Sequence, residues 1–448
     1  MYARSLILSL IVAAPAAAQQ PVVAASDTTV PRTLQPAPER ITLADAITRA
    51  LRVMPSTVQA QGAVRTAGAQ QRVAYGAFLP NINASSNGSK SFSELPSRTD
   101  PTTGQLITSS SNVGLNMGLN ASIDLWTGLR RGADIASANA TSRSADAGVV
   151  NAQYQARLQV TQAYLDALAN AQTVDVRVTS VRRAMEQLKV SIAKLHAGST
   201  TRSDSLRSEV NLGNARVALI NAEIAQATSE ASLGRLIGAA GRVAAIDDST
   251  YYRPAAVDTT GLRATARANA PQVLSAEASR KAAEASVRSA YAAYSPTLTL
   301  SGSYNFNGSS KTFNQNPLYN SRNLSLGLSW PLFNRFARER NVVSAQVSAD
   351  NAAATAADAA RQVDAGLTQQ IIQLTAAQAR IAITQSSVLA AREDLRVVGE
   401  RYRLGAATIV DLLTSQEALT QAEIDAVNAR FDYLRAKAQV EALIGRSL

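Results

Sequence analysis

Hydrophobic and polar residues alternate strictly in two short segments that lie far apart in the chain. From 115 to 123, apolar residues alternate with asparagine, glycine and serine, and from 324 to 330 leucine and tryptophan alternate with serine and glycine. A period of two is typical of a β-strand with one apolar and one polar face. The pattern predicts strands at about 112–125 and 322–333, each preceded by a weaker partner strand, at about 79–90 and 296–307.

Polar stretches separate the strands of each pair, and a very long helical stretch follows each pair. Residues 93–111 and 308–321 are rich in serine, asparagine and threonine, which predicts exposed loops. No proline interrupts 128–195, which as a helix at ~1.5 Å per residue would extend roughly 100 Å. Apolar residues near the helix ends show the 4-3-4-3 spacing of a coiled coil. The predicted seam residues are Val181, Met185, Leu188, Ile192 and Leu195 in the first half and Val388, Ala391, Leu395, Val398 and Tyr402 in the second.

The chain is an internal tandem duplication. Residues 198–238 align without gaps on 405–445. Self-similarity at a fixed offset predicts two copies of one structural unit, each with a helix, two strands and a long helical hairpin. The predicted divisions are a first repeat at 41–238, a linker at 239–260 and a second repeat at 261–445, with hairpin tips at 196–205 and 403–412.

The first residues have the features of a secretory signal peptide. Arg4 precedes a short apolar run, and the alanines at 16–18 form a small-residue cleavage site. We predict a cleaved signal peptide at 1–18, export through the Sec pathway and a flexible segment at 19–40. The chain has no cysteine, so neither a disulfide nor a lipid-modified N-terminal cysteine is expected.

The amphipathic strands suggest how the mature protein would occupy a membrane. No later stretch approaches 18 consecutive apolar residues, so a spanning helix is not expected. The other structure that satisfies its backbone polar groups in a bilayer is a closed barrel. Four strands are too few to close a barrel that holds water, so several chains are predicted to share one barrel as a homo-oligomer.

Aromatic residues gather where the predicted strands meet the helices, among them Trp126, Trp330, Phe333 and Tyr291. Amphipathic rings favour the boundary between a bilayer and water, which makes these residues candidates for contact with membrane lipid. Packing between the sheet and the helices would also explain them. The two interpretations are compatible.

Composition and charge exclude several classes of function. A formal net charge of +11 is compatible with nucleic-acid binding, but the basic residues are scattered singly along helical stretches, as on solvated helix faces, so no nucleic-acid partner is expected. His196 is the single histidine, and the sequence shows no phosphate-binding loop and no cluster with metal-ligand spacing. We therefore expect neither an enzyme nor a cofactor or metal site.

The stretch RYRLGAATIVDLL at the second tip predicts a tight turn between two helices. Gly405 can adopt the left-handed conformation that ends a helix. Thr408 and Asp411 have the spacing of a capping box, and the first tip repeats the pattern with Gly198, Thr201 and Asp204. Helix capping alone would explain why both tips have an acid at this position. In an oligomer, Asp411 would also recur around an axis and could form a negatively charged constriction.

These features together resemble the outer membrane efflux protein family of TolC-like channels. The export signal, the tandem copies and the stretches AYGAFLPNINAS, RYRLGAATIVDLL and TQAEIDAVNARFDYLRAKAQVEALIG carry the resemblance, which covers the chain from about Ile41 to Gly445. It implies a mixed α and β fold in which a homotrimer forms an outer membrane β-barrel, four strands per chain, continued by a long α-helical coiled-coil tunnel through the periplasm. The implied partners are outer membrane lipid, a periplasmic adaptor (membrane fusion protein) and an inner membrane pump of the RND or ABC type.

The resemblance also implies roles for residues of the two tips. Asp411 matches an entrance aspartate ring, and Tyr402 and Asp204 match contacts that lock the entrance. Gly198, Gly405 and Ala406 lie in turns that would face the adaptor. The family's best-known member has a basic residue two positions after the turn glycine and a second acid three positions after the first, where this chain has Ala407 and Thr414. One hypothesis is that Arg202 supplies the missing positive charge; a solvated arginine is the other interpretation.

The predicted function is therefore that of a passive exit duct in a tripartite efflux pump or a type I secretion system. The alternative is a non-conducting coiled-coil stalk of the cell envelope. Drug, metal ion and protein substrates all stay open at this point.

Overall fold

The computed structural model describes residues 38–99, 101–102, 104, 106–247, 261–310 and 319–446. The predicted signal peptide at 1–18 and most of the segment at 19–40 lie outside the described residues. The same holds for 248–260, the greater part of the predicted linker.

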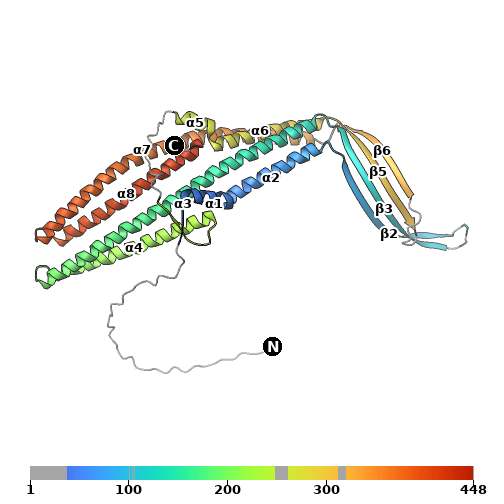
Figure 1. Cartoon of the computed structure of the whole chain (residues 1–448). Coiled ribbons are helices and arrows are strands. Elements are labelled where there is room, and N and C mark those ends of the chain that lie inside the picture. The colour runs from blue at the N-terminus through green and yellow to red at the C-terminus, as the bar shows by residue number, and fades with distance from the viewer. Residues whose placement is uncertain are drawn as a thin grey trace, which may run out of the picture. The chain divides into compact units, whose positions relative to one another are not determined.

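Apart from the short strands β1 and β4 and one turn of 3-10 helix, the described parts of the two halves contain the same elements in the same order (Figure 1). The first half contains α1 (Leu43–Val53), α2 (Pro55–Gly76), β2 (Asn81–Thr99), β3 (Leu106–Trp126), α3 (Arg130–His196) and α4 (Arg202–Ile237). The second contains α5 (Leu262–Asn269), α6 (Pro271–Tyr291), β5 (Thr297–Ser310), β6 (Tyr319–Ser329), α7 (Ala337–Arg403) and α8 (Ile409–Ile444). Helices α3 and α7 both have 67 residues, and α4 and α8 both have 36. The duplication is therefore present in the structure as well as in the sequence.

The four long strands form one antiparallel sheet in the order β2-β3-β5-β6. Strands β2 and β3 extend much further than their sequence pattern predicted and occupy most of 93–111, so the prediction of a long exposed loop there was wrong. Ladder hydrogen bonds join backbone groups, so a serine-rich hairpin can continue after the apolar alternation ends. Strand β6 ends at Ser329, earlier than predicted, two residues before Pro331, which has no N–H to donate.

A second, small sheet lies beside the middle of the long helices. Strand β1 (Glu39–Ile41) pairs in parallel with β4 (Val243–Ala245). The described ends of the predicted flexible segment and of the predicted linker are therefore ordered against each other. The Tyr164 hydroxyl donates to the Ile246 carbonyl at 2.6 Å, which joins α3 to this sheet.

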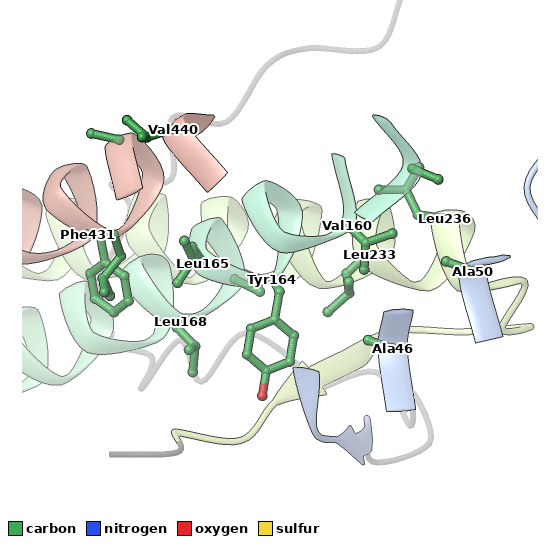
Figure 2. Packing of buried hydrophobic residues seen from close by; sticks show 14 of the residues in the cluster. Ala46, Ala50, Val160, Tyr164, Leu165, Leu168, Leu233, Leu236, Phe431 and Val440 are labelled. Atoms are coloured by element: carbon green, nitrogen blue, oxygen red, sulfur yellow. The ribbon is translucent and has the colours of Figure 1, made fainter. Parts of the chain in front are cut away.

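The main core forms where helices of both halves meet this small sheet (Figure 2). Leu165 and Val160 of α3, Leu233 of α4 and Phe431 and Val440 of α8 are almost completely buried. Alanines such as Ala46 and Ala50 fill the remaining contacts and let the helices approach closely. This core joins the two repeats.

The two helical hairpins pack differently below this core. In the second hairpin, the predicted seam is correct near the tip, where Tyr402 packs with Leu395 and Val398. In the first hairpin the predicted seam is only partly correct, because Leu188 and Leu195 are half-buried but Met185 and Ile192 are exposed. The fully buried residues there are Ala184, Gln187 and Ser191. The Ser191 and Ser208 hydroxyls lie 2.8 Å apart. Helices α3 and α4 thus contact each other through small and polar side chains. The spacing of the large apolar residues had predicted a different face of α3 for this contact.

Among the described residues, no helix is both long enough and apolar enough to cross a membrane.

Candidate functional site

Both hairpins turn through a glycine in the left-handed conformation. Gly198 has φ 73° and Gly405 has φ 77°, a region that other residues rarely adopt. The chain then returns toward the helix it has left, since the Ser199 N–H donates to the Lys194 carbonyl at 2.9 Å and the Ala406 N–H donates to the Arg401 carbonyl at 2.7 Å. These bonds satisfy carbonyl groups that a helix end leaves free.

Each returning helix starts with the predicted capping box. In the second tip, the Asp411 carboxylate accepts from the Thr408 N–H at 2.9 Å and from its hydroxyl at 2.8 Å. In the first tip, the Asp204 carboxylate accepts from the Thr200 hydroxyl at 2.6 Å and from the Thr201 N–H at 3.3 Å. Both acids therefore act as caps inside a single chain.

The capping bonds also keep the two acids ionised. The N–H and hydroxyl of Thr408 lower the pKa of Asp411, and the charge of Arg401 adds to this effect. The Thr200 hydroxyl is the main cause of the lowered pKa of Asp204. Because Asp411 is exposed, its negative charge faces solvent in the single chain.

Tyr402 is the centre of the second tip. Its side chain is only 7% exposed and packs with Ile409 and Leu412 of α8. The Lys194 ammonium of the first hairpin lies 4.0 Å from the centre of the Tyr402 ring and donates to the Tyr402 carbonyl at 2.6 Å. A cation at this distance from an aromatic face is attracted by the ring quadrupole. This contact joins the two hairpins close to their tips.

Neither Asp204 nor Arg202 was found in contact with Tyr402. Asp204 is bonded to its own turn, and Arg202 is bonded only through its backbone, where its carbonyl accepts from the Ser205 hydroxyl at 2.9 Å; within the described residues its guanidinium forms no hydrogen bond or ion pair. Sequence reasoning missed Lys194. Its only signal was a basic residue in the last turn of α3, which a helix C-terminus favours in any protein.

A groove of about 520 Å³ separates α4 from α8 just above the tips. Its walls combine apolar residues of both helices with polar ones. They include Leu206, Val210, Asn214, Val410, Leu413 and Thr414. Thr414 thus lies in this groove, whereas Asp411 is not among the residues that line it.

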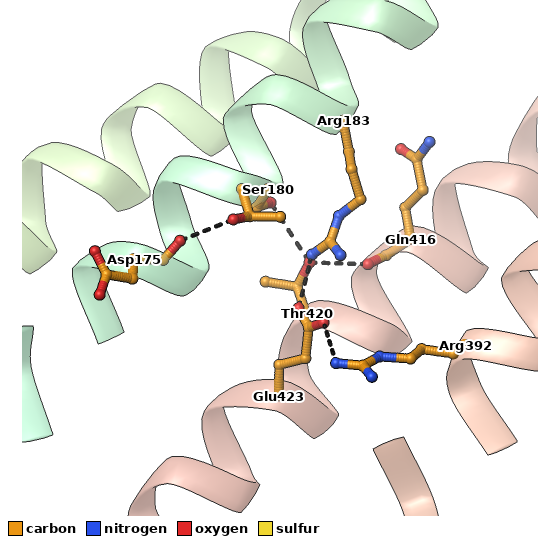
Figure 3. A network of polar contacts seen from close by, with 8 residues as sticks. Asp175, Ser180, Arg183, Arg392, Gln416, Thr420 and Glu423 are labelled. Carbon is orange, nitrogen blue, oxygen red and sulfur yellow. Dashed lines mark hydrogen bonds and ion pairs between the residues drawn. The ribbon is translucent and has the colours of Figure 1, made fainter. Parts of the chain in front are cut away.

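Further from the tips, a polar network links the two hairpins (Figure 3). The Arg183 guanidinium of α3 donates to Glu423 at 2.9 Å and to the Thr420 hydroxyl at 3.1 Å, both on α8. Arg392 of α7 approaches the other Glu423 oxygen at 3.6 Å. The Arg183 and Glu423 side chains are 21% and 15% exposed, so this ion pair is only weakly screened by solvent.

The four predicted membrane-contact aromatics lie at the opposite end of the long helices from the tips. In the single chain, Trp126, Trp330, Phe333 and Tyr291 are 48%, 59%, 71% and 50% exposed. Trp330 also donates its indole N–H to the Tyr294 carbonyl at 3.2 Å, which fixes it at the junction between sheet and helix. Contact of these side chains with lipid stays a prediction.

The described residues contain no group of three or more side chains that could hold a metal ion. What the tips offer chemically is a set of fixed charges, a buried aromatic side chain beside a cation, and a groove. The chain thus has helical hairpins at one end and the antiparallel sheet at the other.

The chain is similar to known proteins over most of its length. The profile of the family described as outer membrane efflux protein matches residues 46–239 and 262–446. The outer membrane efflux protein BepC of Brucella suis biovar 1 is 22% identical over 408 residues, which cover 90% of this chain and 86% of BepC. The alkaline protease secretion protein AprF of Pseudomonas aeruginosa is 24% identical over 294 residues, which cover 64% of this chain and 61% of AprF. The structure of the CmeC outer membrane channel of Campylobacter jejuni superposes with a TM-score of 0.74 at 16% identity and covers 90% of this chain and 85% of CmeC.

The fold and the tips thus define an outer membrane channel that extends into the periplasm. The chain belongs to the outer membrane efflux protein family. The predicted family, the TolC-like fold and the function as an efflux or secretion channel are confirmed, and the family is one of transporters and not of enzymes.

Proposed function

We propose that three copies of this chain form one channel, with a shared β-barrel in the outer membrane and a shared helical tunnel in the periplasm. The main support is the pair of equal helical hairpins, whose capped tips are joined by Lys194 and Tyr402. Around an axis, three such pairs would narrow the periplasmic end. The channel is passive, and its partners supply energy and most of the substrate selectivity.

The lock that we propose centres on Tyr402 and adds Lys194 to the contacts expected from the sequence. Tyr402 is buried against its own hairpin and covered by Lys194, so separation of the two hairpins must remove the ammonium group from the ring. Asp411 serves first as a cap, and its exposed charge then contributes to a cation-favouring ring at the entrance. Arg202 stays a candidate for pairing with Asp411 between chains.

The adaptor would bind at the turns and in the groove beside them. Gly198, Gly405 and Ala406 are exposed at the tips, and the groove between α4 and α8 opens next to them. Its mixture of leucine, valine and amide side chains suits another helical hairpin. Docking there would push α4 and α8 apart and so act on the hairpins that hold the lock.

Both an efflux and a secretion system are compatible with this channel, because BepC is described as an efflux protein and AprF as a protease secretion protein. An inner membrane pump of the RND or ABC type would complete the assembly. The rival function, a stalk without a passage, predicts the same helices but no ion flow.

Conductance of the purified protein in a planar bilayer tests the proposal. We expect small conductance for the wild type, because the lock is closed, and several-fold larger conductance for Lys194→Met together with Tyr402→Ala. A variant with Arg361→Gln, at an exposed site on α7, serves as the control. The absence of conductance from all three proteins, although each is an inserted trimer, would favour the stalk.

A further inference from the structure

The turns that lead from the sheet into α3 and α7 have the same backbone conformation in both repeats. Gly128 and Leu129 have φ 61° and 70°, and the equivalent residues of the second repeat, Arg335 and Phe336, have φ 57° and 62°. This left-handed region favours glycine, and the non-glycine residues of the described chain that adopt it are Leu129, Arg335 and Phe336. The two turns therefore share a backbone but present different side chains.

One arginine braces each turn from inside the chain. The Arg131 guanidinium lies 4.8 Å from the centre of the Phe78 ring, and the equivalent Arg338 lies 4.6 Å from the centre of the Tyr294 ring. Each guanidinium also donates to a backbone carbonyl near the end of its strand. These two arginines are engaged within the chain and hold the turns in place, so any ligand of the turns must bind to other residues.

In the second repeat, four other side chains of the turn project into solvent. Phe333 and Phe336 are 71% and 68% exposed, and their ring centroids lie 5.5 Å apart. Arg335 lies between them in the sequence, and Arg340 follows Phe336 by one helical turn; both arginines are exposed. Arg340 donates to the Asn341 amide oxygen at 2.9 Å, whereas the Arg335 guanidinium has no hydrogen bond or ion pair within the described residues. We call Phe333, Arg335, Phe336 and Arg340 the junction patch.

The equivalent turn of the first repeat lacks both of these cations. Gly128 stands in the place of Arg335, and a Cβ atom on Gly128 would lie 1.8 Å from the Ser295 Cβ, so no larger residue fits there. Ala133 stands in the place of Arg340. The duplication thus supplies two turns of one shape, of which only the second carries two free-standing arginines between exposed rings.

The carboxylates near the two turns interact with other residues. Asp124 accepts from a threonine hydroxyl of β5 at 2.7 Å. Asp134 lies 3.6 Å from Arg130, and Glu339 lies 4.0 Å from Arg338. Within the described residues, neither arginine of the junction patch forms an ion pair. The patch therefore presents positive charge that an external anion can neutralise.

The junction patch continues the exposed apolar face of the sheet toward the helices. Strand β6 meets α7 at this turn (Figure 1). Leu326, Leu328 and Trp330 alternate along β6 and the residue after it, and they are 62%, 71% and 59% exposed. The protein is an outer membrane channel that extends into the periplasm, so the junction between sheet and helices belongs to the periplasmic side of the membrane. Aromatic rings favour the depth of the lipid head groups, and arginine side chains reach the phosphates from there.

We propose that the junction patch binds the head group of an anionic phospholipid in the periplasmic leaflet of the outer membrane. Arg335 and Arg340 bind its phosphate, and the Phe333 and Phe336 rings contact the glycerol backbone and the upper acyl chains. Planar guanidinium groups bind phosphate oxygens through paired hydrogen bonds. A zwitterionic head group has a cation of its own, so two arginines favour a head group with net negative charge. The inference rests on the proposed function, which places the sheet in the membrane, and adds a lipid site to it.

Tryptophan fluorescence tests the proposal, because the chain has two tryptophans, one near each turn. W126F leaves Trp330 as the reporter of the second repeat, and W330F leaves Trp126 as the reporter of the first. Each protein is reconstituted in phosphatidylcholine vesicles that contain a small fraction of either brominated phosphatidylglycerol or brominated phosphatidylcholine. The ratio of quenching by the two brominated lipids measures enrichment of the anionic head group, since the bromine atoms lie at the same depth in both.

For Trp330, we expect brominated phosphatidylglycerol to quench about three-fold more strongly, since each arginine near an anionic surface contributes roughly five-fold to binding. R335Q/R340Q in the W126F background should lower this ratio to about one. The matched control is R216Q/R361Q, which removes the same charge from exposed sites on α4 and α7 and should keep the ratio. Trp126 should give a ratio less than half that of Trp330, because its turn lacks the two arginines.

Three results would overturn the junction patch and leave the channel in place. The first is an unchanged ratio in R335Q/R340Q, and the second is an equal loss in R216Q/R361Q, which would assign the preference to net charge. The third is a full loss of the preference on addition of millimolar inorganic phosphate, which would assign the patch to a soluble anion.

Conductance of the same vesicles separates this inference from the proposed function. If neither brominated lipid quenches Trp330 although the vesicles conduct ions, the junction lies outside the bilayer, so the lipid site is wrong and the channel stands. The absence of both quenching and conductance would overturn the lipid site and the proposed function together.

Discussion

The two helical hairpins have equal lengths and the same caps, yet their interiors differ. The second hairpin closes around Tyr402, Ile409 and Leu412, all nearly buried. The first closes through Ala184 and Ser191, which are just as buried but much smaller. The duplicated hairpins thus share one backbone, while their interior side chains have diverged. The second hairpin carries Tyr402, and the first contributes Lys194, which covers its ring.

The first hairpin leaves its larger apolar residues on the outside. Leu206, Val210, Val217 and Ile224 of α4 are 50%, 63%, 58% and 59% exposed. The ion pairs are also placed unequally. Arg183 of α3 pairs with Glu423, but its equivalent in α7 is Ala390. The ion pair of Arg183 with Glu423, which we call the Arg183 clamp, therefore joins the two hairpins of one chain, and the second repeat has no arginine at the position equivalent to Arg183.

The largest expected effect comes from the aromatic residue that only the second tip has. Tyr402→Ala should destabilise that tip by about 3 kcal/mol, since a buried ring and its cation are lost. Leu195→Ala, the equivalent change in the first tip, should have less than half this effect because Leu195 is only partly buried. Hydrogen exchange of peptides covering 395–413 and 188–206 measures both. Equal loss of protection in the two variants would contradict this, because it would show that Leu195 stabilises the first tip as much as Tyr402 stabilises the second.

The Arg183 clamp should give the next largest effect. Arg183→Met leaves the half-buried Glu423 with only Arg392, at 3.6 Å, and should cost about 1–3 kcal/mol. Arg216→Met changes the residue equivalent to Glu423 in the first repeat, is exposed, and should change stability by less than about 0.5 kcal/mol. Thermal unfolding of the purified proteins compares them. A clamp variant as stable as the control would mean that solvent replaces the ion pair.

Lys194 offers a comparison between two basic residues in equivalent places. Lys194→Met removes the cation from the Tyr402 ring and should weaken the contact between the hairpins by about 1–2 kcal/mol. Arg401→Met is the matched control, because the Arg401 guanidinium donates to the Ala406 carbonyl at 3.4 Å and acts on the charge of Asp411, both in its own hairpin. Single-channel conductance should rise in the first variant and not in the second. A rise in both would assign the effect to net charge at the entrance.

The caps should respond equally in both hairpins. Thr201→Ala and Thr408→Ala each remove the hydroxyl of a capping box and should cost about 1 kcal/mol of helix stability. Hydrogen exchange at the first turns of α4 and α8 measures the loss. A much larger effect of Thr408→Ala would show that the packing of Tyr402, Ile409 and Leu412 depends on the cap.

The smallest effect is the pH dependence of the tips. The pKa values of Asp204 and Asp411 are lowered in the folded protein, so their stabilising contribution is complete above the ordinary carboxyl pKa of ~3.9 and is lost as the pH falls through the folded values. Protection of the first turns of α4 and α8 should therefore decrease below about pH 4. In Asp411→Asn, α8 should lose this pH dependence while α4 keeps it. Persistent pH dependence in α8 would assign it to another acid.

Several features of the protein could be predicted from the sequence because they depend on neighbouring residues. A turn glycine followed by a threonine and an acid at fixed spacing ends one helix and starts the next in any context, and both tips confirm it. Alternation of period two likewise identified β3 and β6, and self-similarity identified the two repeats.

The sequence-based predictions were wrong where contacts between distant residues determine the structure. The strand pair at 93–111 continues through polar residues because each strand satisfies the other's backbone. The seam of the first hairpin follows Ala184 and Ser191 because close packing of α3 on α4 favours small side chains over larger apolar ones. Thus a pattern of apolar residues identified a helix but not the face that its partner covers.

The order of the long elements, the two-fold repetition, the positions of the tips and the resemblance to the family could all be read from the sequence, since they depend on local spacing, short motifs and comparison of the chain with itself. The contacts of Lys194 with Tyr402 and of Arg183 with Glu423 could not, and they are visible only in the folded chain. These residues are about two hundred positions or more apart, and they meet only because the central core sets how the two hairpins lie against each other.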